Sequence, residues 1–393
     1  MPTPYIVDMV RTPVGRFGKS LKDEHPAELA AYAARKLVER TGVDPSIIDF
    51  VVMGHVIRAG TSMDTARQVV LRAGFPLNID GMTVDMVCAS GMAAIITAYR
   101  MIKLGEADVV LAGGTESMSY APIMLPSSAR WGIRHLIGRK AELVDAMVHD
   151  GLFDVFEGRV MGEEADLVAK KHGATRDELD WIAYESYRRA GEAWDKGYMK
   201  DYVVPYEKNG KVLLDYDEGV RRDTSIEKLS RIPPAFFPDG LHTAGNSSQL
   251  SDGAAVLLLM SEDKMKELGY KPKARILGYS FAGVETWRFP EAPIYAVRDL
   301  LKKTGLSVGD IDYWENNEAF AVSSWLMHHI AGIPYEKLNV HGGAIAIGHP
   351  LGMSGARITI ELINVLEKHG GRRGVASICH GLGGAAALAL ELT

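Results

Sequence analysis

Cysteine is scarce in this chain of 393 residues, and several other features are missing from it. Its two cysteines, Cys88 and Cys379, are too few for a disulfide-stabilised scaffold, and neither has partners at zinc-finger spacing. No stretch reaches the roughly 18 uninterrupted apolar residues of a membrane span. The first residues, MPTPYIVD, lack the pattern of a signal peptide, and the last three, ELT, are not a peroxisomal signal. We therefore expect a cytoplasmic protein with no membrane partner.

Positive charge is not in excess either, because the net charge is −6. This balance argues against a nucleic-acid partner, so a phosphate-bearing ligand would need a local basic group. An apolar content of 47% and a charged content of 24% are ordinary for a globular protein. The length suits two or three domains with a large core.

The clearest organisational feature is an internal duplication. Residues 32–50, YAARKLVERTGVDPSIIDF, align without a gap with residues 295–313, YAVRDLLKKTGLSVGDIDY. Each stretch has the pattern of an amphipathic helix with a glycine cap, followed by a run typical of a β-strand. A second pair of helix-then-strand patterns follows in the same order, at 91–114 and 355–379. Two such echoes predict two homologous α/β halves.

The segment between the two halves has no counterpart of its own. A stretch as long as 118–246 is not expected to be plain loop, so we interpret it as a subdomain that covers one face. The predicted division is an N-terminal half of 1–117 plus 247–270, an insertion of 118–246, and a C-terminal half of 271–393.

Cys88 lies where the apolar stretch VDMV meets small residues and then a predicted helix. This layout resembles a nucleophile elbow, and it predicts a thiol near a helix N-terminus, where the dipole favours thiolate. Taken alone, the pattern favours a buried core thiol, because free cysteine is among the most buried residue types.

Two glycine-rich segments near the C-terminal end carry further candidate groups. His349 lies in GGAIAIGHPLG, where the glycines indicate a tight loop that passes close to a ligand. A lone histidine is usually structural, but a nucleophilic thiol needs a base. Cys379 ends a predicted strand and precedes glycines whose N–H groups can form an oxyanion hole. Because Cys379 and Cys88 occupy different places in their halves, two distinct thiols could meet where the halves join.

Two polar residues beside these segments have weaker signals. Asn317 follows the strand predicted at 313–316, where asparagine is most often a turn former, although it can also orient a water or a carbonyl. His380 is a rival base, but it adjoins Cys379 on a strand, and neighbours on a strand point to opposite faces.

Together these segments resemble the thiolase family. The similarity rests on VCASGM around Cys88, NEAF at 317–320, GGAIAIGHPLGMSGAR at 342–357 and CHGLGG at 379–384. TAGNSSQLSDGAA at 243–255 also resembles the family's coenzyme A loop. The resemblance implies an α/β fold in which duplicated βαβαβαββ halves form an αβαβα layered core, with an inserted loop subdomain that covers the coenzyme A site.

The resemblance also implies the catalytic roles. Cys88 takes up the acyl group as a thioester. His349 activates Cys88 and, with a water held by Asn317, forms one oxyanion hole. Cys379 removes or returns the α-proton of the second acyl-CoA. The backbone N–H groups of Cys88 and Gly381 form a second oxyanion hole.

A larger set of residues is implied for coenzyme A. Arg221 suits a phosphorylated adenosine, because its guanidinium is a planar cation with several donors. The complete implied set is Arg221, Ser248, Ala244, Phe236, Ala319, Phe320, Met161 and Leu152.

Three positions depart from the family pattern. Val160 stands where many short-chain members carry His, Lys228 where some carry Ser, and His341 where Asn is usual. Valine at 160 removes a polar group near the pantetheine and the acyl chain, which leaves two substrate ranges open. The predicted acyltransferase of lipid metabolism either condenses two acetyl-CoA reversibly to acetoacetyl-CoA and coenzyme A, or cleaves 3-ketoacyl-CoA of broader chain length.

Two other readings compete with this one. Decarboxylating condensing enzymes replace the second thiol with His, so Cys379 favours a thiolase. A non-catalytic acyl-CoA-binding protein would not need all four catalytic side chains, and all four are present. The resemblance also implies a homodimer or homotetramer. Coenzyme A thioesters are expected as substrates, with no metal or redox cofactor.

Overall fold

The N-terminal part of the chain supplies one half of a large sheet. The computed structural model describes residues 2–132, 134, 137–138 and 142–393. The strands of this half are β1 (Pro4–Arg11), β2 (Gly15–Arg16), β3 (Phe50–Gly54), β4 (Asp80–Val84), β5 (Val109–Ser117) and β12 (Ser251–Ser261). Its helices are α1 (Pro26–Thr41), α2 (Thr65–Ala73), α3 (Ser90–Leu104) and α8 (Glu262–Glu267).

The C-terminal part supplies the other half. Its strands are β13 (Ala274–Gly283), β14 (Tyr313–Asn316), β15 (Arg373–His380) and β16 (Gly384–Leu392). Its helices are α9 (Ala292–Thr304), α10 (Ala321–His329), α11 (Ala344–Ile347) and α12 (Leu351–His369). The strand order across the whole 10-stranded sheet is β14-β15-β16-β13-β1-β12-β5-β3-β4, with β2 paired to β12. The two halves join where β1 pairs with β13.

The halves repeat each other in local detail. α1 and α9 both end at a left-handed glycine, Gly42 with φ 68° and Gly305 with φ 69°. Asp49 accepts a backbone N–H at the start of β5 over 2.9 Å, and Asp312 accepts one at the start of β15 over 2.9 Å. These equivalent caps and bonds confirm the two homologous halves predicted from the sequence.

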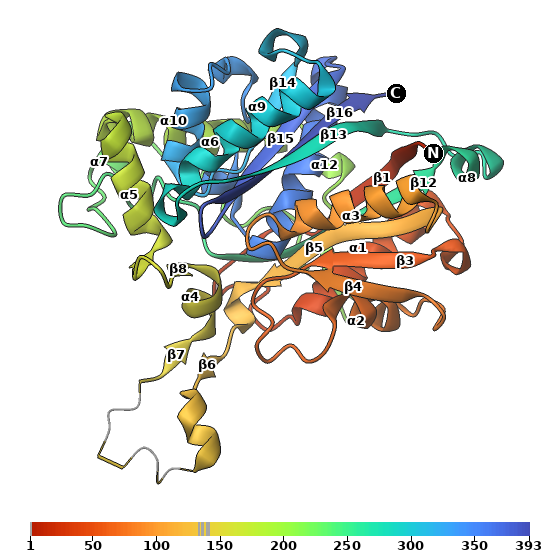
Figure 1. Cartoon of the computed structure of the whole chain (residues 1–393), viewed down its shortest axis with the longest axis horizontal. Coiled ribbons are helices and arrows are strands. Elements are labelled where there is room, and N and C mark those ends of the chain that lie inside the picture. The colour runs from red at the N-terminus through yellow and green to blue at the C-terminus, as the bar shows by residue number, and fades with distance from the viewer. Residues whose placement is uncertain (1, 133, 135–136, 139–141) are drawn as a thin grey trace.

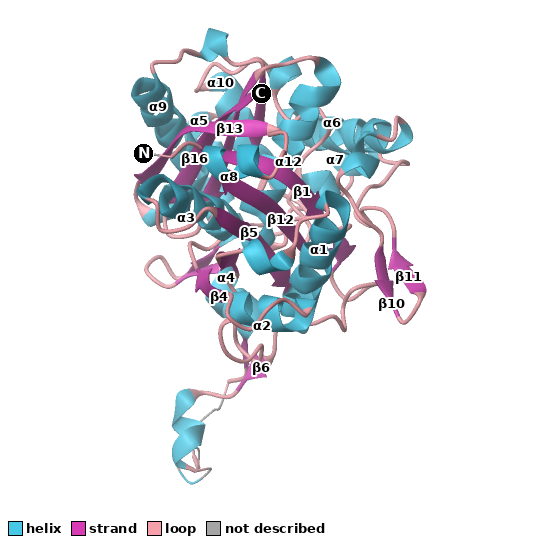
Figure 2. Cartoon of the chain, turned by 90° about the vertical axis from the view of Figure 1, so that its right-hand side faces the viewer, coloured by secondary structure: helices cyan, strands magenta, loops and turns pink. Residues whose placement is uncertain are grey.

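The elements stack as helix, sheet, helix, sheet, helix (Figures 1 and 2). α1 and α2 cover the outer face of the first half-sheet, α9 covers the outer face of the second, and α3 and α12 lie between them. A sheet half with helices on both faces must be apolar on both, and every residue of β12 is buried. This is the αβαβα core that the sequence predicted.

The two central helices approach each other closely because they carry glycines where they meet. A Cβ on Gly355 would lie 2.3 Å from the backbone nitrogen of Met92, and one on Gly91 would lie 2.8 Å from that of Ala356. The stretch Val87–Leu104, which contains α3, is long and apolar enough to cross a membrane by composition alone. Its position between two half-sheets accounts for that composition without a membrane.

The segment between β5 and β12 forms smaller elements of its own. Its described residues add no strand to the large sheet and make three short pairs, β6–β7, β8–β9 and β10–β11. Those strands are β6 (Ile123–Met124), β7 (Val144–Asp145), β8 (Phe153–Asp154), β9 (Arg159–Val160), β10 (Tyr206–Lys208) and β11 (Lys211–Leu214). The helices are α4 (Ala146–Gly151), α5 (Met161–His172), α6 (Arg176–Asp195) and α7 (Ile226–Ser230). The domain boundaries proposed above stay a prediction.

One part of this segment stands apart from the body. β6 and β7 lead into an arm that projects away from the layered core (Figures 1 and 2). Figure 1 shows α5 and α7 on the side of the molecule opposite α8 and the N-terminus. The described residues of the segment therefore form helices and short strands, as expected for an insertion of this length.

Candidate active site

Cys88 lies on a strained turn between β4 and α3. Val87, the residue before it, has φ of 47°, a left-handed conformation that is uncommon for a valine. The Ser90 hydroxyl stabilises this turn, because it accepts the N–H of Met86 over 2.8 Å and donates to the carbonyl of Val87 over 2.6 Å. The predicted elbow is present, and it directs Cys88 into a cavity.

The cavity has a volume of about 450 Å³ and brings together most of the predicted site. Three predicted catalytic residues line it, and so do seven of the eight predicted coenzyme A residues. These are Cys88, His349 and Gly381, with Leu152, Met161, Phe236, Ala244, Ser248, Ala319 and Phe320. Val160 also lines it, beside residues that the sequence did not single out, such as Val148, Phe289, Gln249 and Leu351.

Backbone contacts hold the predicted coenzyme A loop against the NEAF segment. The N–H of Ser248 donates to the carbonyl of Ala319 over 3.0 Å, and Ser247 forms an isolated antiparallel bridge with Phe320. Two segments more than 60 residues apart thus form one wall of the cavity.

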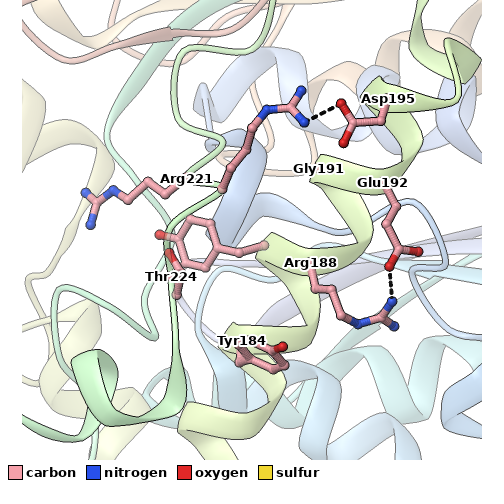
Figure 3. A pocket seen from close by; sticks show the side chains of 9 residues that line it. Tyr184, Arg188, Gly191, Glu192, Asp195, Arg221 and Thr224 are labelled. Carbon is pink, nitrogen blue, oxygen red and sulfur yellow. Dashed lines mark hydrogen bonds and ion pairs between the residues drawn. The ribbon is translucent and has the colours of Figure 1, made fainter.

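Arg221 is the predicted coenzyme A residue that the cavity does not include. It lines a neighbouring pocket of about 270 Å³ on α6, with its guanidinium 6.0 Å from the centre of the Tyr187 ring. Figure 3 shows this side chain extending away from Asp195 and Glu192. In the same pocket Arg188 pairs with Glu192 over 2.5 Å and Arg222 pairs with Asp195, so carboxylates hold these two arginines.

His349 is held by a loop that requires glycine. Gly348 has φ of 116°, and a Cβ there would lie 2.4 Å from the Ser251 hydroxyl oxygen. The backbone N–H of His349 donates to the carbonyl of Gln249 over 3.0 Å. The imidazole is therefore positioned between the glycine loop and the start of α12, as the glycine pattern predicted.

The hydrogen bonds of His349 determine its tautomer. The Ser354 hydroxyl donates to the carbonyl of Pro350 over 2.8 Å, so it can only accept from Nδ1 of His349, which lies 2.6 Å away. The proton is then on Nδ1, and Nε2 carries a lone pair. Nε2 lies 3.4 Å from the side-chain nitrogen of Asn317, which is a donor. Both contacts leave Nε2 as the basic atom of the site.

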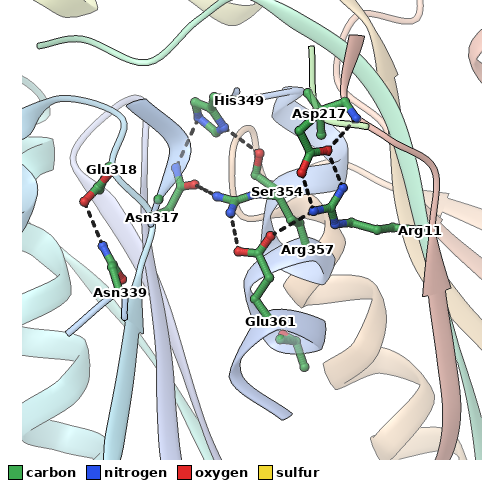
Figure 4. A network of polar contacts seen from close by, with 12 residues as sticks. Arg11, Asp217, Asn317, Glu318, Asn339, His349, Ser354, Arg357 and Glu361 are labelled. Carbon is green, nitrogen blue, oxygen red and sulfur yellow. Dashed lines mark hydrogen bonds and ion pairs between the residues drawn. The ribbon is translucent and has the colours of Figure 1, made fainter. Parts of the chain in front are cut away.

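Burial, together with the nearby Arg357 cation, lowers the pKa of His349 to about 3. The imidazole is consequently neutral at physiological pH and can accept a proton. Figure 4 shows Asn317 and Ser354 on two sides of this ring.

The Cys88 thiol does not behave as the helix dipole alone predicted. Burial raises its pKa far above the ordinary value, and a negative charge on Cys379 would raise it further. The backbone N–H groups of Gly381 and Cys88 itself act in the opposite direction. Desolvation therefore outweighs the dipole and the N–H groups, and it favours the neutral thiol. This agrees with the expectation that a nucleophilic thiol here would need a base.

Cys379, at the end of β15, is the second buried thiol. Burial raises its pKa to about 12, and the nearby Ser323 hydroxyl on α10 opposes part of that rise. Both cysteines are free. His380 forms a contact of 2.8 Å between Nδ1 and the carbonyl of Gly381, and it is not among the described residues that line the cavity.

Sequence reasoning missed several residues that support this site. Ser354 and Arg357 lie inside the motif GGAIAIGHPLGMSGAR, and their positions on α12 after His349 were the signal that could have identified them. Ser323 and Glu116 had no such signal. Glu116 is fully buried and accepts the N–H of Gly352 over 2.9 Å, which fixes the start of α12.

No metal site was found among the described residues, which contain no group of three or more His, Cys, Asp or Glu side chains arranged to hold an ion. The functional groups that line the cavity are the Cys88 thiol, the His349 imidazole and Gly381. Cys379 and Asn317 are not among the described residues that line it; Cys379 is near enough to influence the Cys88 thiol, and Asn317 contacts His349. Such groups can form a thioester on one cysteine and transfer protons with the other.

Comparison with known proteins places this geometry in a family. Residues 4–263 match the family model described as thiolase, N-terminal domain, and residues 270–392 match thiolase, C-terminal domain. An acetyl-CoA acetyltransferase from Synechocystis sp. is 45% identical over 98% of both chains.

Solved structures agree with these matches. The crystal structure of the Bacillus anthracis acetyl-CoA acetyltransferase superposes with a TM-score of 0.96 at 41% identity, covering 100% of this chain and 99% of that one. A thiolase from Ascaris suum in complex with coenzyme A gives a TM-score of 0.92 at 36% identity, covering 100% of both chains.

Proposed function

This chain belongs to the thiolase family and is an acyltransferase, and from that premise we propose that it condenses two acetyl-CoA reversibly to acetoacetyl-CoA and coenzyme A. One observation carries the proposal: Cys88, His349 and Gly381 line one cavity, and Cys379 lies near enough to influence the Cys88 thiol. The acetyl-CoA acetyltransferases described above support acetyl-CoA as the substrate.

The first half-reaction transfers the acetyl group to Cys88. Nε2 of His349 takes the thiol proton as the sulfur attacks the thioester carbonyl, because a thiol with a raised pKa ionises only when its proton has an acceptor. The N–H groups of Cys88 and Gly381 donate to the oxyanion that forms. The carbonyl re-forms, the coenzyme A thiolate leaves, and it takes the proton from His349.

The second half-reaction forms the carbon–carbon bond. Cys379 first passes its thiol proton to His349, because only the thiolate can accept an α-proton. The Cys379 thiolate then removes an α-proton from the second acetyl-CoA, and the resulting carbanion attacks the acetyl group on Cys88. The protonated His349, with a water held by Asn317, stabilises the enolate oxygen. Cys88 leaves as a thiolate and takes the proton from His349, while Cys379 keeps the α-proton as its thiol. Thiolysis uses the same groups in reverse.

Substrate binding is assigned to the walls of the cavity. We propose that the seven lining residues implied for coenzyme A contact the pantetheine and acyl groups, and that Arg221 contacts the adenosine end outside the cavity. Val160 presents an apolar side chain to the cavity where many short-chain members present His, but the acetyl-CoA acetyltransferases that resemble this chain do not favour the alternative of a broader 3-ketoacyl-CoA range.

The assembly proposed for the protein is a homodimer or homotetramer. β4 is at the edge of the large sheet, where unpaired backbone groups can pair with a second copy. The projecting arm exposes large apolar side chains that a monomer would leave in water. These are Ile123, Leu125, Trp131 and Leu143, which are 59%, 64%, 72% and 67% exposed.

A cytoplasmic location and the absence of a metal or redox cofactor belong to the same proposal. Both thiols must stay reduced to act, and a reducing compartment keeps them so. The thiols and the imidazole supply every proton transfer, so coenzyme A thioesters enter as substrates and no cofactor is needed.

Labelled acetyl-CoA tests the proposal. Acetyl should appear on a peptide that contains Cys88 in the unmodified protein and in Cys379→Ala, whereas Cys379→Ala should fail to exchange the α-protons of acetyl-CoA. An unlabelled Cys88 would refute the acyl-enzyme, and condensation retained by Cys379→Ala would remove Cys379 from its role. Cys88→Ser serves as the control for label on other side chains.

A further inference from the structure

A buried network of charged side chains runs from the β1 terminus to the catalytic histidine (Figure 4). Arg357 on α12 donates to the side-chain oxygen of Asn317 over 2.9 Å and to Glu361 over 2.5 Å. Glu361 lies 3.5 Å from Arg11, which donates to both oxygens of Asp217 over 2.6 and 2.8 Å. All four charged side chains are fully buried.

Burying two cations and two carboxylates is costly, because each loses its hydration. Well-packed apolar side chains in their place would often be as stable or more stable. A buried network of this kind therefore contributes something besides stability. In Figure 4, dashed lines join Arg357 to Glu361 and to Asn317. Asn317 is the uncharged partner of the two, so an effect of the network on the site would pass through the Asn317 amide.

The chemistry of Arg357 leaves Asn317 one orientation. A guanidinium has donors and no acceptor, so the atom that faces it must be the amide oxygen of Asn317. The amide nitrogen then faces Nε2 of His349 at 3.4 Å. In the reverse orientation two donors would oppose each other at Arg357, and the amide oxygen would face the lone pair of Nε2.

A neighbouring carboxyl group leaves the charge of Arg357 available for this contact. Glu315 on β14 is buried, neither of its oxygens has a hydrogen-bond partner among the described residues, and burial raises its pKa well above the ordinary value, which favours its neutral form. Burial also raises the pKa of Glu361, but Arg357 and Arg11 oppose that rise and both contact its carboxylate. Glu361 and Asp217 are therefore the carboxylates that pair with the two arginines.

We propose that Arg357 is a positioning residue of the reaction: it orients the Asn317 amide so that its nitrogen, the donor, faces Nε2 of His349 and can hold the water of the oxyanion hole. Arg357 touches neither substrate nor reacting atoms and acts through Asn317 and His349. The inference rests on the proposed function, because the amide needs this orientation only if it donates during carbon–carbon bond formation.

Kinetics of two substitutions test the assignment. Arg357→Met removes donor and charge, and Arg357→Lys keeps both on a shorter side chain. Arg357→Met should lower kcat for thiolysis of acetoacetyl-CoA by about 10²-fold with little change in KM, since misorientation by about 1 Å can have that effect. Arg357→Lys should recover part of kcat. An unchanged kcat in Arg357→Met would overturn the proposal.

A double-mutant cycle separates positioning from general stability. In an Asn317→Ala background, Arg357→Met should reduce kcat by no more than about two-fold, because the group through which it acts is gone. Arg11→Lys is the matched control: Arg11 is equally buried and belongs to the same network, but it bonds Asp217 and not Asn317. Arg11→Lys should act equally in both backgrounds. A full Arg357→Met effect in Asn317→Ala would show a merely structural role.

Alkylation of Cys88 by iodoacetamide supplies a readout that needs no acyl transfer. Because the Arg357 cation helps to lower the pKa of His349, its removal should move the acid limb of the alkylation profile to higher pH. Arg357→Lys and Arg11→Lys should leave that limb in place. If unmodified protein fails to acetylate Cys88, the proposed function fails, whereas an acid limb unmoved in Arg357→Met counts against Arg357.

Discussion

The Ser354 hydroxyl lies 2.6 Å from Nδ1 of His349 and points its own proton at the carbonyl of Pro350, 2.8 Å away. This pairing keeps the imidazole proton on Nδ1 and leaves Nε2 free to act as a base toward Cys88. The contact involves one turn at the start of α12, so a small substitution can remove it without disturbing the rest of the helix.

Ser354→Ala should therefore lower kcat by about 10²-fold, because part of the imidazole population adopts the tautomer with a proton on Nε2. Thr359→Val is a matched control on the same helix. Thr359 is also buried, and its hydroxyl donates to the carbonyl of Gly355 over 2.8 Å, away from the site. Steady-state thiolysis of acetoacetyl-CoA would check this, and equal losses in the two variants would contradict it.

Ser323→Ala should slow α-proton exchange by about 10-fold while Cys88 still takes up acetyl. The Ser323 hydroxyl opposes the rise in the pKa of Cys379, so its loss makes the Cys379 thiolate harder to form. Exchange of acetyl-CoA protons with deuterated solvent measures this step separately from acylation. Ser324→Ala is the control, because that hydroxyl bonds Glu318 over 3.2 Å. Exchange that Ser323→Ala leaves unchanged would contradict the prediction.

Gly162→Ala should raise the KM for acetyl-CoA by about 10-fold with kcat retained. A Cβ at position 162 would lie 2.1 Å from the Phe236 ring, which would have to leave its place in the cavity wall. In Gly309→Ala, on an exposed turn before β14, the nearest atom would lie 3.8 Å from the new methyl group, so KM should not change. An unaltered KM in Gly162→Ala would show that Phe236 does not contribute to binding.

Val160→His should narrow the range of acyl-chain lengths that the enzyme accepts as substrates. The valine presents an apolar surface to the cavity, and an imidazole would place a polar group against a long acyl chain. Relative rates over 3-ketoacyl-CoA of increasing length should fall more steeply in the variant. Lys228→Ser is the control, because position 228 also departs from the family pattern but carries an exposed side chain that pairs with Asp223. This variant should leave the ratio of long-chain to short-chain rates unchanged. A ratio that Val160→His does not alter would refute a role for this position.

His341→Asn should make stability less sensitive to acid. Burial, helped by His369 and by the cations Lys196 and Lys368, lowers the pKa of His341 to about 3. Unfolding restores a pKa near 6.5. Between these values the unfolded chain binds the extra proton, so stability present above the unfolded pKa is lost as the pH falls, by about 2 kcal/mol at pH 5.

Thermal unfolding between about pH 7 and pH 5 measures this slope. His149→Asn, on the exposed part of α4, is the control and should keep the slope of the unmodified protein. A His341→Asn variant with the same slope would place the acid sensitivity elsewhere, with His349 the next buried imidazole to consider.

Local patterns in the sequence determined the duplicated halves, the elbow at Cys88 and the glycine loop of His349. Each of these features depends on residues that are close together in the sequence. Gly42 caps the helix that it follows, and Gly348 can adopt its positive φ because it has no Cβ. The resemblance to the thiolase family added catalytic roles for Asn317 and Gly381, because these residues lie in the motifs NEAF and CHGLGG.

Only the tertiary structure decided the protonation state of the site and the residues that set it. The Cys88 thiol is neutral because desolvation, which requires the packed layers, outweighs the nearby dipoles. Arg221 lies in a pocket beside the cavity, and Arg357 meets Asn317 across 40 positions of sequence. Burial and long-range contacts of this kind arise only when the two halves come together, so no local pattern contains them.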